Sequence, residues 1–290
     1  MASRFVFSAL LATTTIATLT SEASAFEVKH SASGQLVSWH RTSVAWTVDR
    51  SVRKVPGGEE AVAAAAAAWT QRSGAPALAV AAVDAKLSPG LDGTNAVFFV
   101  EGGFAPAGNA LAVTVLSFDE TTGDVLDADI VLNGKYQLGL VQKGTTHPTA
   151  ITDPGGEIYD IDRVLAHEMG HALALSDEPA DTSALMYPCV SRAVALATSR
   201  RELAASFEAK ATVTSVSTTS VNGLFRSEVE VATTWCTATD CPPAARFVTW
   251  GGTIDHVRQE IGGVQVPAAG DAVLLVLDQQ VIRSMTRMEK

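Results

Sequence analysis

The sequence has little positive charge. Lysine and arginine number 21 against 31 aspartates and glutamates, which gives a formal net charge of -10 and a sequence pI near 5.0. Proteins that bind nucleic acids need basic patches for the phosphates, so this balance argues against a nucleic-acid partner. After residue 25 the chain also lacks any apolar run near the ~20 residues that span a bilayer. We therefore expect no nucleic-acid partner and no membrane span.

Cysteine is also scarce, with three in the chain. Cys236 and Cys241 lie five residues apart between apolar segments, which favours a hairpin disulfide if the protein is exported. A zinc site is the weaker interpretation, because two cysteines without a nearby histidine do not complete a tetrahedral set. Cys189 is left over and fits a buried free thiol.

The first 25 residues have the features of a secretory signal peptide. Arg4 supplies a positive start, residues 5–19 are mostly apolar, and residues 23–25 form an A-x-A cleavage site. The alternative, a buried first helix, fits poorly with the threonines at 13–15 and the small residues that end the segment. No cysteine near the cleavage site offers a lipid anchor. We predict cleavage after Ala25 and a secreted, extracellular protein.

Between residues 26 and 160 the pattern predicts one helix among several strands. The helix covers 59–72, with glutamates in its first turn and Trp69 toward the core. In the last predicted strand, Asp127 and Asp129 either bind calcium or mark a solvated strand end. The predicted strands are 44–48, 77–83, 96–100, 110–118 and 125–132, the last two as a hairpin.

The composition changes near Lys210, where apolar and polar residues begin to alternate. A helix over 199–209 is predicted just before this change. We divide the chain into a signal peptide at 1–25, a domain at 26–209 and a small all-β module at 210–290. The strands predicted in the module are 211–219, 225–232, 246–250 and 272–277, separated by turns rich in glycine and proline.

The most informative segment is His167-Glu168-Met169-Gly170-His171, an H-E-x-x-H sequence. Asp160 or Asp162 can cap a helix that contains it, and apolar residues recur at helical spacing on both sides. Histidines four residues apart share one face of a helix, where both can bind a single zinc ion. The glutamate between them is placed to act as general base toward a zinc-activated water.

Downstream residues extend this pattern. Asp177 follows the second histidine by six residues, and Met186 lies in a Ser-Ala-Leu-Met-Tyr-Pro run at 183–188. The stretch resembles the metzincin pattern H-E-x-x-H-x-x-G-x-x-(H/D) with its methionine turn, and the final run resembles the matrixin branch. Two positions depart from matrixins. Asp177 stands where they carry histidine, as in snapalysin-like bacterial enzymes, and Ala174 replaces the glycine of the turn.

The resemblance implies a zinc metalloendopeptidase that acts on a peptide or protein substrate. His167, His171 and Asp177 would hold the Zn²⁺, Glu168 would be the catalytic base, and Met186 would form an apolar floor under the metal. It also implies an α+β fold, with a twisted mixed sheet and an active-site helix, followed by the small all-β module. Residues 110–118 would be an antiparallel edge strand over the cleft, to which an extended peptide can add. We expect a monomer.

Other interpretations compete with this one. His167 and His171 could be ordinary core histidines, but then five suitable residues must coincide in order. Another class of zinc peptidase would take its third ligand from Glu202, which the position of Met186 argues against. The chain could also be an extracellular binding or adhesion protein with an inactive metzincin-like domain, although such a relic has no need to retain Glu168 between two histidines.

Overall fold

The computed structural model describes residues 27–288 except for 73, 83–86, 142–157, 180, 182–183, 188–205, 239–241, 263–265 and 279–280. The predicted signal peptide lies outside this part of the chain, as do Cys189, Cys241 and Glu202. The cleavage site, the disulfide and the alternative third ligand therefore stay predictions.

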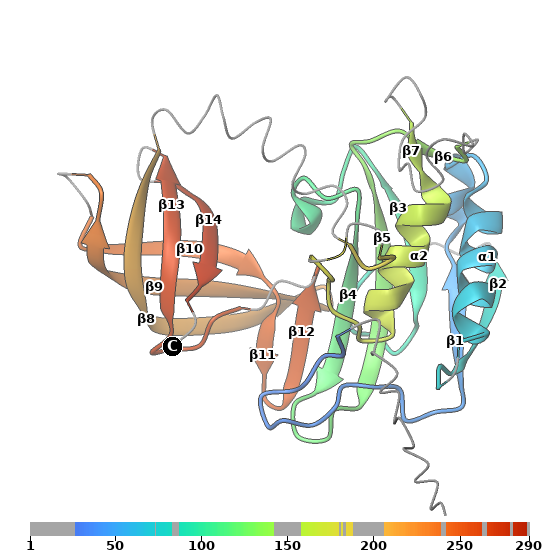
Figure 1. Cartoon of the computed structure of the whole chain (residues 1–290), viewed down its shortest axis with the longest axis horizontal. Coiled ribbons are helices and arrows are strands. Elements are labelled where there is room, and N and C mark those ends of the chain that lie inside the picture. The colour runs from blue at the N-terminus through green and yellow to red at the C-terminus, as the bar shows by residue number, and fades with distance from the viewer. Residues whose placement is uncertain are drawn as a thin grey trace, which may run out of the picture.

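Seven strands form the larger sheet, in the order β11-β12-β4-β5-β3-β1-β2 (Figure 1). The strands β1, β2, β3 and β5 are parallel to one another, whereas β4 is antiparallel to β5. All five lie within two residues of their predicted bounds, because their apolar and β-branched residues favour a half-buried sheet. These strands are β1 Ser43–Val48, β2 Ala77–Ala82, β3 Ala96–Glu101, β4 Ala112–Asp119 and β5 Val125–Gly134.

Two α-helices in the described part of the chain, α1 Gly58–Thr70 and α2 Ile161–Ala172, cover one face of this sheet (Figure 1). The predicted helix over 59–72 is thus confirmed. The alanines of α1 let the two helices approach closely, and Trp69 joins them by donating from Nε1 to the carbonyl of Ala166 at 2.8 Å. Short 3-10 helices lie at Arg50–Lys54 and Ala105–Ala107. Neither α-helix is long and apolar enough to cross a membrane.

A second sheet of five antiparallel strands, in the order β10-β9-β8-β13-β14, lies beside the first (Figure 1). Its core consists of small apolar residues such as Val213, Val229 and Val273. The helix predicted over 199–209 is wrong where the structure describes it, because β8 begins at Ser206. The strands are β8 Ser206–Val221, β9 Leu224–Cys236, β10 Ala244–Trp250, β13 Ala272–Asp278 and β14 Val281–Arg287.

The predicted α+β fold, with a metzincin-type domain followed by a separate small all-β module, is wrong. Of the described residues, 46% are in strands and 16% in helices. The seven-stranded mixed sheet also includes two strands from beyond residue 209, namely β11 Gly252–Ile254 and β12 Val257–Ile261. The physical reason is that the outer edge of β4 needs partners for its N–H and C=O groups, and β12 supplies them.

This pairing also corrects the expected position of β4 at the edge of the sheet. β12 runs antiparallel to β4 and pairs Val257 with Asp119 and Ile261 with Val115. Along the outer edge of β4, β12 pairs with Val115 to Asp119. Within the described part of the chain, Ala112 to Thr114 face no strand on this edge. The boundary at 209/210 stays a prediction.

Two buried carboxylates lie on the face of β5 that points away from the helices. Asp127 and Asp129 are 2% and 1% exposed, so a solvated strand end does not explain them. Asp129 accepts hydrogen bonds from the backbone N–H groups of Gly90 and Ala96, at 2.7 and 3.0 Å. Oδ1 of Asp127 finds no donor among the described residues. Burial, and then the charge of Asp127, raise the pKa of Asp129 to about 9, and burial raises the pKa of Asp127 to about 6.

We predict that Asp127→Asn stabilises the protein at neutral and alkaline pH. The pKa of Asp127 rises from 3.8 to about 6 on folding, so its ionisation destabilises the folded state as the pH rises through this interval. The substitution should add about 1–3 kcal/mol to the free energy of unfolding at about pH 8 and nothing at about pH 3. Urea titrations at both pH values measure this difference. The exposed Asp255→Asn is the control, and an equal gain at both pH values would contradict the prediction.

Candidate metal centre

Helix α2 positions the H-E-x-x-H residues between α1 and β4. The carboxylate of Asp160 caps the helix by accepting from the backbone N–H of Asp162 at 3.3 Å, so the first of the two predicted caps is confirmed. Leu165 and Met169 are fully buried and fix the rotation of the helix on its neighbours. Because of this rotation, His167 and His171 share the opposite side, where His167 is partly exposed and His171 is buried.

The two histidines converge with Asp177. Nε2 of His167 lies 3.1 Å from Nε2 of His171, and each nitrogen lies 3.4 Å from Oδ1 of Asp177. No other group of three histidine, cysteine or acidic side chains converges in this way in the part of the chain that the structure describes. The sequence-predicted ligand set is therefore brought together, while Asp127 and Asp129 do not belong to such a group.

Backbone carbonyls fix the orientation of both imidazole rings. Nδ1 of His167 lies 3.0 Å from the carbonyl of Leu185, and Nδ1 of His171 lies 2.8 Å from that of Leu175. A carbonyl can only accept, so each Nδ1 carries a proton and donates it. In the neutral rings both Nε2 atoms then direct lone pairs toward the same point. Such lone pairs repel each other at this distance unless a cation lies between them, which is the arrangement of metal-binding histidines.

The carboxylate adds the negative charge that such a cation requires. Oδ1 of Asp177 is buried and has no hydrogen-bond donor within 3.5 Å that meets the usual geometry among the described residues. Burial disfavours its charge, but the two histidines outweigh burial and hold the pKa of Asp177 well below its usual range. Burial likewise opposes the charged form of His167, but Asp177, the charge of Glu168 and the carbonyl of Leu185 together outweigh it, so the pKa of His167 is raised. Two imidazoles and one ionised carboxylate form a donor set that suits zinc.

A tight turn carries the chain from α2 back to Asp177. Ala174 has a φ of 63°, in the left-handed region. The N–H of Leu175 donates to the carbonyl of Gly170 at 3.0 Å, and the N–H of Ala174 donates to that of His171 at 2.8 Å. This is the Schellman arrangement, in which glycine usually occupies the left-handed position. The turn expected from the sequence is present, and alanine adopts it at a cost of about 1 kcal/mol.

Residues 27–29, just after the predicted cleavage site, bind this turn through backbone hydrogen bonds. Sequence reasoning missed this contact. The N–H of Lys29 donates to the carbonyl of Ala174 at 2.9 Å, and the N–H of Ser176 donates to that of Glu27 at 2.8 Å. Val28 thus forms an isolated antiparallel bridge with Leu175. The side chain of Lys29 then reaches Glu260 of β12 at 3.1 Å, with both side chains largely buried. The backbone next to Asp177 is therefore bonded to residues 27–29, and an ion pair links this segment to β12.

Met186 is completely buried and packs against α2 at Gly170. A Cβ atom added at Gly170 would overlap its sulfur and would lie 3.0 Å from the indole of Trp69. The N–H of Glu178 donates to the carbonyl of Met186 at 2.8 Å, and Arg163 donates to that of Ala184 at 2.6 Å. These bonds place the loop at 184–187 directly beside the two histidines.

Glu168 faces β4 and is 7% exposed. The hydroxyl of Thr114 lies 2.8 Å from its Oε2 and 2.9 Å from its main-chain oxygen. Thr114 was not predicted as a site residue, since no sequence pattern relates it to a glutamate 54 residues away.

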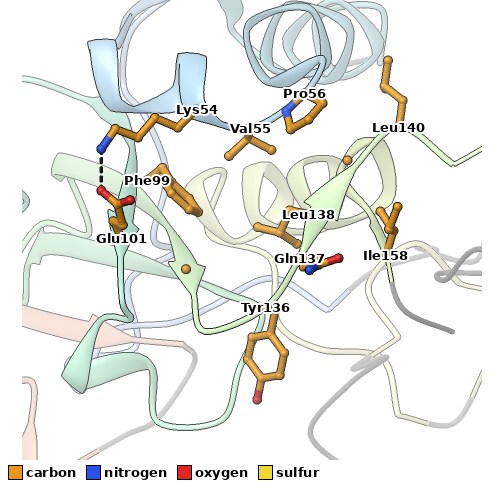
Figure 2. Close-up of a pocket in the computed structure, with 12 residues that line it drawn as sticks. Lys54, Val55, Pro56, Phe99, Glu101, Tyr136, Gln137, Leu138, Leu140 and Ile158 are labelled. Atoms are coloured by element: carbon orange, nitrogen blue, oxygen red, sulfur yellow. Dashed lines mark hydrogen bonds and ion pairs between the residues drawn. The ribbon is translucent and has the colours of Figure 1, made fainter.

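A hollow of about 510 Å³ lies at the opposite end of the helical layer, near β6 Leu138–Gly139 and β7 Tyr159–Asp160. Figure 2 shows the Lys54–Glu101 ion pair at its rim and apolar side chains along its wall. None of the three converging side chains of the metal centre lines it, so the hollow is separate from that centre. Its wall consists of Lys54, Val55, Pro56, Phe99, Glu101, Gly134, Tyr136, Gln137, Leu138, Gly139, Leu140 and Ile158.

No family model matches the chain, and no curated protein matches it either. The resemblance to metzincins therefore stays a prediction that depends on residues 167–188 and on the geometry described above.

We predict that Ala174→Gly stabilises the protein by about 1 kcal/mol, because glycine adopts a positive φ without steric cost. The matched control is Ala172→Gly, two residues earlier within α2, which should destabilise by about 1 kcal/mol or more. Chemical denaturation of both variants measures these shifts. Equal losses in the two variants would show that Ala174 is not strained.

We predict that Gly170→Ala, in contrast, destabilises the protein. Alanine normally stabilises a helix by about 1 kcal/mol relative to glycine, but here its methyl group would overlap Met186. The variant should lose about 1–3 kcal/mol of unfolding free energy. A double-mutant cycle with Met186→Ala isolates the contact, because the pair should be more stable than the two separate losses predict. Simple additivity would argue against this packing.

Proposed function

We propose that the protein is a secreted zinc-dependent endopeptidase with a metzincin-like site, acting as a monomer on peptide or protein substrates. The observation that carries the proposal is the convergence of two imidazole Nε2 atoms and one ionised carboxylate, with both Nδ1 atoms bound to carbonyls. His167, His171 and Asp177 would hold the Zn²⁺. Three protein ligands leave a position open for water or substrate, which is typical of catalytic rather than structural zinc.

Each residue then has a distinct chemical role. Zinc at this position would polarise the scissile carbonyl and make water acidic enough to react near neutral pH. Glu168 takes a proton from the attacking water and passes it to the nitrogen of the leaving amine. The carbonyls of Leu175 and Leu185 keep the imidazoles in one tautomer, and Met186 supports the turn beneath them.

Zinc content and hydrolysis of casein, each measured on the same variants, test the proposal. Glu168→Ala should keep the zinc and lose about 10²- to 10⁴-fold or more in rate, because it removes the base and not a ligand. Asp177→Ala should lose zinc and activity together. Glu178→Ala is the matched control, since its neighbouring carboxylate is one residue out of register and should be dispensable for both. A chelator should abolish hydrolysis, and added zinc should restore it.

Two outcomes would refute the proposal. If Glu168→Ala cleaves casein at the wild-type rate, Glu168 is not the base. If the wild type binds zinc at His167, His171 and Asp177 but hydrolyses neither casein nor a set of unstructured peptides, the chain is a binding protein with a metal site rather than a peptidase.

A further inference from the structure

The contact between Thr114 and Glu168 joins the large sheet to the centre of α2. Thr114 is 2% exposed, and its hydroxyl lies within hydrogen-bond distance of two oxygens of the same glutamate. The hydroxyl has a single proton, so it donates to one oxygen at a time. The main-chain oxygen of residue 168 is already the acceptor of an α-helical bond. The carboxylate Oε2 is therefore the stronger acceptor, and charge strengthens this bond.

Thr114 itself has little freedom to move. It pairs with Ile130 of β5 on one side. On the other side its carbonyl accepts from the N–H of Gly262 at 3.0 Å, directly after β12 ends. A β-branched side chain on a strand has few χ1 rotamers, so the hydroxyl is held in one place by the sheet. Glutamate, in contrast, has three rotatable side-chain bonds and depends on its partners for orientation.

We infer that Thr114 is a positioning residue for Glu168, whose carboxylate it holds through Oε2, leaving Oε1 to take the proton from the attacking water. The inference rests on the proposed function, in which Glu168 is the base. Without the hydroxyl, a buried carboxylate oxygen loses its donor and the side chain can rotate away from its working position. Misplacing a reacting group by about 1 Å costs up to about 10²-fold in rate.

The test compares Thr114→Val with Thr114→Ser in the full-length, zinc-loaded protein, using a fluorogenic peptide. Valine has the shape of threonine without the hydroxyl, and serine retains the hydroxyl. We expect Thr114→Val to keep its zinc and its KM within about 2-fold while kcat falls about 10- to 100-fold. Thr114→Ser should retain kcat within about 3-fold of the wild type. A purely structural role would not separate kcat from KM, nor serine from valine.

Ser117→Ala provides the matched control. Ser117 is another fully buried hydroxyl on β4, but it bonds Gln259 of β12 rather than the base. Gln259 Nε2 keeps its bond to the carbonyl of Gly223 in this variant, so kcat should stay at the wild-type value. Should Thr114→Val fail to fold, Thr114→Ala takes its place, with the same expected loss relative to Thr114→Ser.

The possible failures are distinguishable. If Glu168→Gln abolishes hydrolysis while Thr114→Val retains the wild-type kcat, the proposed function stands and the positioning role of Thr114 is wrong. Equal losses of kcat in Thr114→Val and Thr114→Ser would also refute that role, because the hydroxyl would not matter. If the wild type does not hydrolyse peptides, or if Glu168→Gln is fully active, the proposed function fails and this inference fails with it.

Discussion

The antiparallel pairing of β12 with β4 is the interaction on which the architecture depends. β4 contacts α2 on one face, pairs with β5 along one edge and with β12 along the other. β12 also carries Glu260, which binds Lys29, and Gln259, which donates to Ser117. One strand near the C-terminus thus stabilises the sheet, the segment that holds the turn before Asp177, and the backbone of Thr114.

The candidate metal centre combines rigid donors with an electrostatic conflict. Backbone carbonyls leave each imidazole one orientation, and the buried Asp177 oxygen faces both rings without a donor of its own. Without a proton or a metal cation among them, these groups repel or remain unsatisfied. The neighbouring turn carries strain of its own at Ala174. Such local destabilisation around Ala174 and Asp177 is typical of functional sites.

Local patterns predicted much of the structure. The strands up to residue 134, helix α1, the helix through His167 and the positive φ at Ala174 all follow from spacing, capping and turn chemistry. The fold class did not follow, because Val257–Ile261 reads Val-Arg-Gln-Glu-Ile, with polar residues in the middle, and its partner is far away in sequence. The burial of Asp127 and Asp129 could not be predicted for a similar reason, since the loop near Gly90 that covers them is not adjacent in sequence. Thr114 and residues 27–29 reach the site through tertiary contacts, which hydrophobic periodicity in the sequence cannot predict.

The link between β12 and β4 has a consequence for how the protein is made. Ser117 and Gln259 are separated by 142 residues, and Lys29 and Glu260 by 231. Contacts of such separation form late, because a long loop must close before they contribute. A chain emerging from the ribosome or a translocation channel therefore exposes the outer edge of β4 until nearly all of it has been synthesised. During that interval the unpaired edge is open to other chains, and a product truncated before residue 257 would keep it as a permanent template for aggregation.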